Sequence, residues 1–429
     1  MIDLGINVFG FIKGEFGIAE ATRLNCKAIL QADIPLNIIN YDVKTNHNDN
    51  DNTFTEFAEK AEYPINLIQI SPSEEVFNFF SHFDFSFFQG KYNILYMAWE
   101  SETIPESYIA HINLFDEIWT PSEYCKKCIE KYVSLPVIVI PHPVQFPLNE
   151  PEDKSVEDIF DEDKFNFLFI FDYNSSLERK NVLNLIKAFR KTFDTTENNA
   201  FLTIKTSLST RFSEEKKQIL DAIGSSEKIK IVEKIFDKNS FNNLINHCDC
   251  YISLHRAEGF GLTMAEAMFL GKPVIATGYS GNLEFMNSEN SFLVHAQKVN
   301  SQSAVINYDS NTIWSEPDLQ QAEEYLKIVF SNKELLKSKA QKGYATVHEK
   351  LSFQHIGQLI KERGLEIIAQ NKIQKNKSSL IKIYSEYVHL KKDIKIYKKE
   401  CANTIYLQHK NVSEKQKRQK IIIPCLLFF

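Results

Sequence analysis

Two glutamates separated by seven residues, Glu258 and Glu266, bracket a glycine-containing turn. The sequence predicts a strand that ends near Leu254, a turn through Gly259 and Gly261, and then a helix. A helix start presents free backbone N–H groups and a positive dipole end, which suits a phosphate, and glycine lets the backbone approach it closely. Each carboxylate can accept hydrogen bonds from two adjacent hydroxyls. The pattern therefore favours a site for a sugar linked through a diphosphate.

Each of these glutamates also has a simpler explanation. Glu258 alone could be a solvated loop residue, and Glu266 alone could be a surface charge on a helix. The combination favours a binding site, because a diphosphate at the helix start would lie between the two carboxylates. One acid would then face the groups on the far side of the phosphates, and the other would face the near side.

Three other motifs have spacings that occur in metal sites. Asp49-Asn50-Asp51 matches an Asp-x-Asp pattern, but it lies in a stretch rich in Asn and Asp, which favours a solvated loop. Cys125 and Cys128 have metal-ligand spacing, yet no second pair follows at the distance of a zinc finger, and we interpret them as ordinary thiols. Cys248 and Cys250 lie at the start of a strand, which favours core positions.

Five further residues are candidates for the wall of a cleft. His142 stands between two prolines and either lines the cleft or holds a turn. His255 and Arg256 precede the glycine turn; they either touch phosphate or acceptor, or pack at the strand end. Trp99 and Glu100 follow an apolar strand, and Glu100 could orient an acceptor hydroxyl.

The composition is that of a globular protein with a charged tail. The length of 429 residues predicts two or three domains and favours two. With 43% hydrophobic and 24% charged residues, the composition excludes a disordered or collagen-like chain. Residues 371–429 hold 14 Lys and Arg against 4 Asp and Glu, so the rest carries a net charge of −17. Such an acidic body argues against a nucleic-acid partner. The odd number of cysteines, 7, favours a reducing compartment, and no apolar run reaches membrane-spanning length.

Short β-like runs alternate with helical runs, which predicts parallel sheets covered by helices on both faces. A loop with Gly14 and Gly17 connects the first strand to a helix, and residues 141–163, rich in proline and acids, predict a linker. The expected strands of the first part are Ile2–Phe11, Leu36–Tyr41, Ile65–Ile70, Asn93–Ala98, Glu117–Thr120 and Val137–Ile140. Those of the second part are Phe165–Phe171, Phe201–Thr206, Ile229–Lys234, Cys250–Leu254, Val274–Ala276 and Phe292–Val294.

This order predicts an α/β protein with two doubly wound, Rossmann-like domains that face a cleft. We expect an N-terminal domain over 1–150, a second domain over 151–355, a closing helix over 356–370 and a basic amphipathic helical tail over 371–429. In the tail, apolar residues recur with spacings of 3 and 4 at Leu380, Ile383, Tyr387, Leu390, Ile394, Tyr397 and Cys401. The tail is either docked on the acidic body, paired in a coiled-coil dimer, or laid on anionic lipid.

The run from Ser253 to Phe285 resembles the donor-binding motif of retaining GT-B glycosyltransferases of the large family 4 group. In that group a Glu-x7-Glu pair brackets a Gly-Phe-Gly turn, as Glu258-Gly259-Phe260-Gly261 and Glu266 do here. Residues 175–189 resemble the phosphate-clamp loop of the family. Further similarities to a bacterial branch of the group lie in Trp99-Glu100, Asp116–Ser122, Pro141-His142-Pro143 and Trp314–Asp318. The resemblance covers roughly residues 1–370.

The resemblance implies a role for each matched residue. Glu258 would contact the donor sugar and steady an oxocarbenium-like transition state, whereas Glu266 would accept from the ribose diol. Arg179 and Lys180 would neutralise the diphosphate, although the position of a second family cation is Asn174 here. The remaining implied contacts of the nucleotide sugar are Gly17, Gly259, Phe260, Gly261, Leu262 and Thr263.

The function implied is a metal-independent retaining glycosyltransferase without a cofactor. It would move a sugar from a nucleotide-diphosphate donor to a hydroxyl of a carbohydrate or lipid-linked acceptor. The sequence shows no second acid placed as a nucleophile, which favours a one-step front-face transfer. A sugar-nucleotide epimerase or hydrolase, and a non-catalytic binding module, remain alternatives of the same fold. The expected location is cytoplasmic, with the tail as a contact to a membrane surface or to a second copy.

Overall fold

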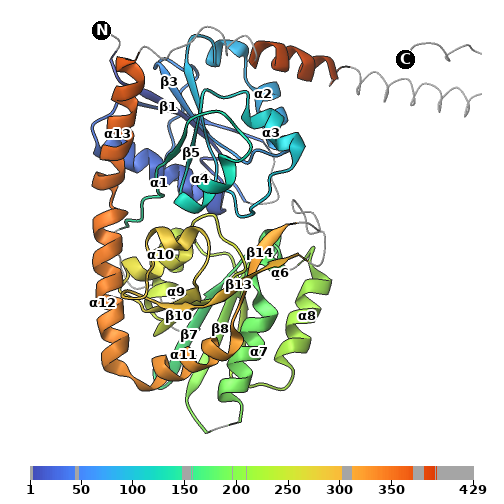
Figure 1. The fold of residues 1–429 in the computed structure, drawn as a ribbon, viewed down its shortest axis with the longest axis vertical. Coiled ribbons are helices and arrows are strands. Elements are labelled where there is room, and N and C mark those ends of the chain that lie inside the picture. The colour runs from blue at the N-terminus through green and yellow to red at the C-terminus, as the bar shows by residue number, and fades with distance from the viewer. Residues whose placement is uncertain are drawn as a thin grey trace, which may run out of the picture.

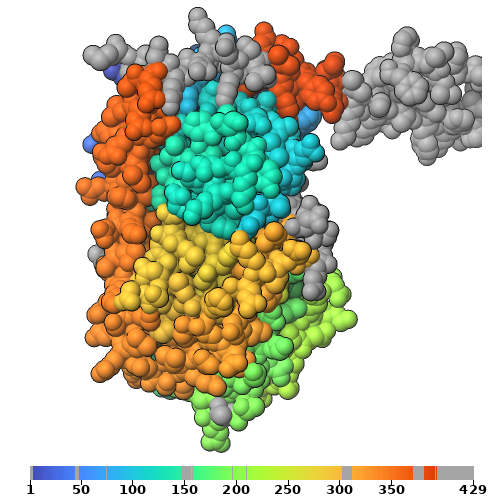
Figure 2. Space-filling view, in the orientation of Figure 1, coloured from blue at the N-terminus to red at the C-terminus, as the bar shows by residue number. Residues whose placement is uncertain are grey.

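The computed structural model describes residues 3–43, 48–146, 156, 158–195, 197–208, 210–301, 312–370, 381–391 and 393. Two α/β domains are stacked along the long axis of the molecule, and helices α12 and α13 run along one side of both (Figures 1 and 2). Each domain is built on a parallel sheet of six strands. The α/β fold class and the two doubly wound domains expected from the sequence are therefore confirmed.

The first domain contains a sheet with the strand order β2-β1-β3-β4-β5-β6. Its strands are mainly apolar because helices cover both faces, and β1 is buried at all five positions, Asn7 included. The strands are β1 (Ile6–Gly10), β2 (Leu36–Asn40), β3 (Ile65–Gln69), β4 (Tyr92–Tyr96), β5 (Glu117–Thr120) and β6 (Val137–Val139). The helices are α1 (Gly17–Gln31), α2 (Glu74–His82), α3 (Glu106–Ile112) and α4 (Glu123–Ile129).

The second domain repeats this architecture with the strand order β12-β11-β10-β7-β8-β9. The strands are β7 (Phe165–Ile170), β8 (Ala200–Thr206), β9 (Ile229–Glu233), β10 (Cys250–Ser253), β11 (Val274–Thr277) and β12 (Phe292–Val294). The helices are α6 (Leu177–Lys180), α7 (Val182–Phe193), α8 (Ser213–Ile223), α9 (Lys238–Asn246), α10 (Leu262–Phe269) and α11 (Leu319–Ser331). Every strand expected from the sequence has a counterpart, with ends that differ by a few residues.

A small antiparallel sheet was absent from the sequence prediction. β13 (Ala296–Asn300) pairs with β14 (Ile313–Pro317), and Trp314 on β14 is fully buried. Residues 302–311 lie outside the described part of the chain. The sequence does not predict these strands because β13 has three exposed polar residues, Gln297, Lys298 and Asn300, and lacks an apolar run.

Two successive helices lead the chain from the second domain back to the first. α12 (Lys333–Lys350) packs on α10, and α13 (Phe353–Ala369) packs on α1 of the first domain. The helices approach closely at Gly357, where an added Cβ atom would lie 2.3 Å from the carbonyl oxygen of Ala28. Arg363 reaches Glu117 with distances of 2.8 Å and 2.5 Å to its two carboxylate oxygens.

The expected linker is only partly described. Within residues 141–146, His142 is buried, and the N–H of Val144 donates to the carbonyl oxygen of Leu351 at 2.7 Å. This part of the connection therefore packs against both domains. The domain boundaries stated above stay a prediction.

The tail contains a helix over residues 381–391 that docks on the first domain, but with a different face from the predicted one. Ile381 and Val388 are fully buried, and the ring of Tyr384 lies 5.9 Å from that of Phe80. The members of the expected apolar row are exposed instead, namely Ile383 (62%), Tyr387 (48%) and Leu390 (60%). The other members, Leu380, Ile394, Tyr397 and Cys401, lie outside the described residues.

Candidate active site

A cleft of about 950 Å³ opens between the two domains. It lies at the carboxyl ends of β7 and β10, the neighbouring strands from which the chain of the second domain winds in opposite directions. Such a switch point is where open parallel sheets bind ligands, because the loops after the two strands diverge. The loop after β7 leads to Arg179 and Lys180, and the loop after β10 carries Glu258 and the glycine turn.

Glycine is required at two points of the turn for steric reasons. Gly261 has a φ of +92°, in the left-handed region, and precedes the first residue of α10. Gly281 lies against the turn, and an added Cβ atom there would come within 2.0 Å of the carbonyl oxygen of Gly259. The backbone thus bends sharply and directs the start of α10 into the cleft.

Residues of the first domain hold this turn from the other side. The hydroxyl of Ser122 donates to the carbonyl oxygen of Gly259 at 2.7 Å, and the thiol of Cys125 donates to the same oxygen at 3.1 Å. The Cβ of Ala98 would lie 3.0 Å from a Cβ atom added at Gly259. The donor-side turn is therefore shaped by both domains.

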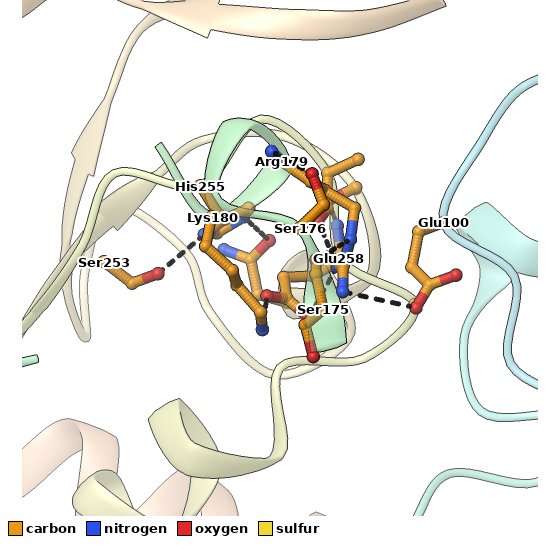
Figure 3. A network of polar contacts seen from close by, with 12 residues as sticks. Glu100, Ser175, Ser176, Arg179, Lys180, Ser253, His255 and Glu258 are labelled. Carbon is orange, nitrogen blue, oxygen red and sulfur yellow. Dashed lines mark hydrogen bonds and ion pairs between the residues drawn. The ribbon is translucent and has the colours of Figure 1, made fainter. Parts of the chain in front are cut away.

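Glu258 lies between two cations of the α6 segment (Figure 3). Lys180 donates to one carboxylate oxygen, and the guanidinium of Arg179 lies 3.6 Å from the other. Burial raises the pKa of Glu258, but Lys180 and Arg179 outweigh it and lower the pKa to about 2. Glu258 is therefore ionised at neutral pH although it is buried.

Arg179 is buried and serves several partners at once. Its guanidinium donates to the carbonyl oxygen of Ala257 at 2.9 Å and to that of Ser175 at 3.2 Å. It also lies 3.7 Å from Glu100 of the first domain. Arg179 therefore braces the loop that carries Glu258, whereas Lys180 reaches the carboxylate itself. Asn174, at the position of the second family cation, also lines the cleft.

Glu266 lies on α10 at the other side of the turn and is almost fully buried. Its carboxylate accepts from Lys238 at 2.5 Å, and the same lysine lies 3.0 Å from Glu20 on α1 of the first domain. Burial raises the pKa of Glu266, and Lys238 opposes this only in part. In Glu20 the balance is reversed: burial raises the pKa, but Lys238 and Arg23 bring it down to about 2.

The other expected donor contacts also line the cleft, namely Gly17, Gly259, Phe260, Gly261, Leu262 and Thr263. Thr263 accepts a hydrogen bond from the hydroxyl of Tyr251 at 2.8 Å. Phe260 is mostly core, because its ring packs between those of His142 and Phe285. The structure thus brings all ten predicted site residues to one cleft, and the roles of the individual residues stay predictions.

Two of the weaker candidates lie elsewhere. His255 is buried against Ser253 and Asn282, at 3.1 Å and 3.2 Å. Arg256 donates to Glu316 at 2.6 Å and stacks near Trp314. Neither is among the residues that line the cleft, so the structural interpretation of both is the better one.

The first domain supplies the opposite wall, which includes Trp99 and Glu100 and the loop from Asn48 to Asn52. This loop is solvated as predicted, with 48–50 and Asn52 exposed. It also borders the cleft, and Asp51 lies 3.3 Å from Arg23. Within the described residues, no group of three His, Cys, Asp or Glu side chains could hold a metal ion. The described cysteines, including Cys125 and Cys128, are buried free thiols.

Sequence reasoning missed Glu20, Lys238 and Ser122 as parts of this site. The acid and the lysine are single charges in ordinary helices, and no local pattern connects positions more than 200 residues apart. Ser122 was noticed only within a longer similarity. The signal that could have marked it is its position two residues after β5, at the start of α4, because ligands bind beyond the carboxyl ends of parallel strands.

Comparisons with known proteins agree with this geometry. Residues 153–343 match the family described as glycosyl transferases group 1. No curated protein sequence matches the chain. In the described part of the chain, no helix combines the length and apolar character needed to cross a membrane.

Several solved structures share the fold at low sequence identity. Anabaena Alr3699/HepE in complex with UDP and glucose has a TM-score of 0.59 at 14% identity, over 84% of this chain and 99% of that chain. Sucrose-phosphate synthase from Thermosynechococcus elongatus has a TM-score of 0.61 at 12% identity, over 86% and 100%. A glycosyltransferase from Rickettsia africae has a TM-score of 0.59 at 15% identity, over 85% and 99%. These similarities establish the GT-B fold.

Proposed function

We propose that this chain, whose residues 153–343 match the glycosyl transferases group 1 family, is a glycosyltransferase that uses a nucleotide-sugar donor. It would transfer the sugar, with retention of configuration, to a hydroxyl acceptor. The acceptor proposed is a glycan, a polysaccharide or a glycolipid. The observation that carries the proposal is the placement of Glu258 and Glu266 on the two sides of one glycine turn, in one cleft, with Lys180 beside the first.

The diphosphate would lie at the start of α10, where backbone N–H groups are free and the helix dipole is positive. Lys180 and Arg179 would add fixed positive charge as the leaving group develops negative charge. Glu258 would accept hydrogen bonds from the sugar hydroxyls, and its carboxylate would stabilise the positive charge that develops on the ring. Glu266 would accept from the ribose diol.

The reaction proposed is a front-face displacement in one step. The acceptor oxygen forms a bond to the anomeric carbon on the face from which the diphosphate departs, while the bond from that carbon to the phosphate oxygen breaks. The acceptor proton passes to an oxygen of the leaving phosphate. The products are the glycoside with retained configuration and the nucleoside diphosphate.

A UDP-sugar is the donor that we propose to test first. The support is the Anabaena protein of the same fold, which was solved in complex with UDP and glucose. A panel of UDP-, GDP- and ADP-sugars, with released nucleoside diphosphate as the readout, would identify the base. Release of nucleotide without any acceptor would instead indicate a hydrolase.

The test of Glu258 is its replacement by glutamine, which keeps the shape and removes the charge. Loss of one preorganised charge that stabilises a transition state lowers turnover by about 10²–10³-fold. We expect this loss for Glu258→Gln, and no loss for the control Glu289→Gln on the exposed surface. Turnover of Glu258→Gln close to that of the wild type would reject the role.

We also propose that the tail holds the enzyme on an anionic lipid surface. The exposed side chains of Ile383, Tyr387 and Leu390 form an apolar face, and Lys391 lies 4.7 Å from the Tyr387 ring centre. The net charge of +10 over residues 371–429 supports a lipid surface more than a protein partner. Each lysine near an anionic lipid surface contributes about 1 kcal/mol to the free energy of membrane binding.

Vesicle binding tests this second proposal. The full chain should bind vesicles that contain phosphatidylserine and should not bind neutral vesicles. Deletion of residues 371–429 should abolish binding. Ile383→Asp combined with Leu390→Asp should weaken it, whereas Lys342→Met on α12 should not. Vesicle binding unchanged by the deletion, or a dimer that the deletion dissolves, would overturn the proposal.

A further inference from the structure

Lys238 connects Glu266, the residue proposed to bind the donor ribose, to the first domain. Lys238 is the first residue of α9, and its ammonium lies 2.5 Å from Glu266 on α10 and 3.0 Å from Glu20 on α1. Both acids therefore share one cation across the interdomain cleft. All three residues line that cleft.

The environment of Glu266 explains why a cation is needed there. The side chain of Glu266 is only 3% exposed, so an unpaired charge at this position would lose its hydration. The charged and titratable groups that face it are Lys238 from α9, Glu20 from α1 and Tyr251 from β10. Among these, only Lys238 favours the ionised carboxylate.

We propose that Lys238 is a positioning residue for the ribose of the donor: it keeps Glu266 ionised and, through Glu20, keeps α1 of the first domain beside the donor site. This inference rests on the proposed function, since it assigns the donor ribose to Glu266. Lys238 is not a catalytic residue, because it acts through the carboxylate and not on the reacting atoms.

The chemistry of a diol makes the charge of Glu266 decisive. An ionised carboxylate has two acceptor oxygens and receives both ribose hydroxyls, whereas a protonated acid has one good acceptor and one donor. Hydrogen bonds to a charged acceptor are also about twice as strong as neutral ones. A site without the lysine would therefore bind the nucleotide more weakly and distinguish ribose poorly from 2′-deoxyribose.

The contact to Glu20 gives the lysine a second anchor. When the ribose hydroxyls approach the oxygens of Glu266, Lys238 can remain beside Glu20, which Arg23 also contacts at 2.8 Å. Removal of the lysine would leave Glu20 and Glu266 facing each other without the cation that they share. Their repulsion would raise the proton affinity of the buried acid, Glu266.

Calorimetric titration of the full chain with UDP and with 2′-deoxy-UDP tests the inference. In the wild type we expect the loss of the 2′-hydroxyl to weaken binding about tenfold or more, as for hydrogen bonds to charged groups. In Lys238→Met this ratio should fall below about threefold, with UDP itself bound at least about tenfold more weakly. Lys238→Arg should restore the ratio, and Lys234→Met, an exposed lysine four residues earlier, should leave it unchanged.

A second variant separates the role of charge from loss of structure. Adding Glu20→Gln to Lys238→Met removes one of the two facing acids, so it should recover part of the ribose preference. A Lys238→Met protein that keeps the wild-type ratio would overturn the inference while the proposed function stands. A wild type that binds none of UDP, GDP and ADP would overturn the proposed function, and this inference with it.

Discussion

The two domains contact each other at two junctions that differ in their residue types. At the cleft, charged residues of each domain reach across to the other, and Arg179, Lys180 and Lys238 each contact acids that a ligand could use. At the other junction, α13 packs on α1 with apolar residues such as Ile356 and Ile360, both fully buried.

The second junction also contains a charge pair, but one of another kind. Glu117 is fully buried and accepts two hydrogen bonds from Arg363, together with those of Tyr92 and Trp119. Glu117 is not among the described residues that line the cleft. The two junctions therefore differ in the surroundings of their charges, because Glu117 is buried and paired away from the cleft, whereas the acids at the cleft border the space that a ligand would occupy.

The largest effect on stability should follow from breaking the buried ion pair at the α13 junction. Arg363→Met leaves Glu117 buried without its cation, which costs about 3–5 kcal/mol of unfolding free energy. Urea denaturation measures this loss, and the exposed pair partner Lys342→Met serves as a control that should change little. Equal stability of the Arg363→Met variant and the wild type would contradict the distinction between the junctions.

The opposite pattern is expected for Lys180→Met at the cleft. Turnover should fall by about 10²-fold, because a fixed cation beside the leaving group is lost. Unfolding free energy should change much less than in Arg363→Met, since Arg179 still lies near Glu258. A variant with normal turnover and low stability would assign Lys180 to the fold and not to the site.

The unfolding free energy should depend on pH through His142, which is buried between the two domains. Burial lowers the pKa of His142 from 6.5 to about 3. Between these two pH values the imidazole is therefore protonated in the unfolded chain and neutral in the folded chain. The stabilisation is complete above pH 6.5 and is lost as the pH falls toward 3, at about 1.4 kcal/mol per pH unit. Between pH 6.5 and pH 5 the wild type should lose about 2 kcal/mol more than His142→Asn.

The smallest effect should come from Ser122→Ala. This change removes the hydroxyl that holds the Gly259 carbonyl from the first domain, and a neutral hydrogen bond contributes about 1 kcal/mol. We expect a several-fold rise in the donor KM with little change in stability. Steady-state kinetics measures this, and a donor KM equal to that of the wild type would show that the Ser122 hydroxyl is not needed to shape the turn.

The sequence predicted the parts of the molecule in which local pattern and structure coincide. Strands such as β1 and β7 are mainly apolar because both faces are buried, and the glycines at 259 and 261 mark a backbone bend. These signals extend over a few residues. They are sufficient to predict the fold class and the glycine turn between Glu258 and Glu266, whereas the other predicted cleft residues follow from the family resemblance.

The rest could not be predicted because it depends on contacts between distant positions. Arg363 and Glu117 are 246 residues apart, and neither differs locally from a surface charge. In the tail, the regular apolar row predicted the wrong docking face. The surface around Phe80 selects Ile381, Tyr384 and Val388 instead, since packing against a domain does not require a heptad pattern.

Hydrogen exchange of the full chain with and without a bound nucleoside diphosphate tests the central claim most directly. If the two acids and the turn between them form the donor site, the ligand should slow exchange over residues 174–180 and 258–266 and leave α13 unchanged. Protection that appears elsewhere, with none at the turn, would contradict the account.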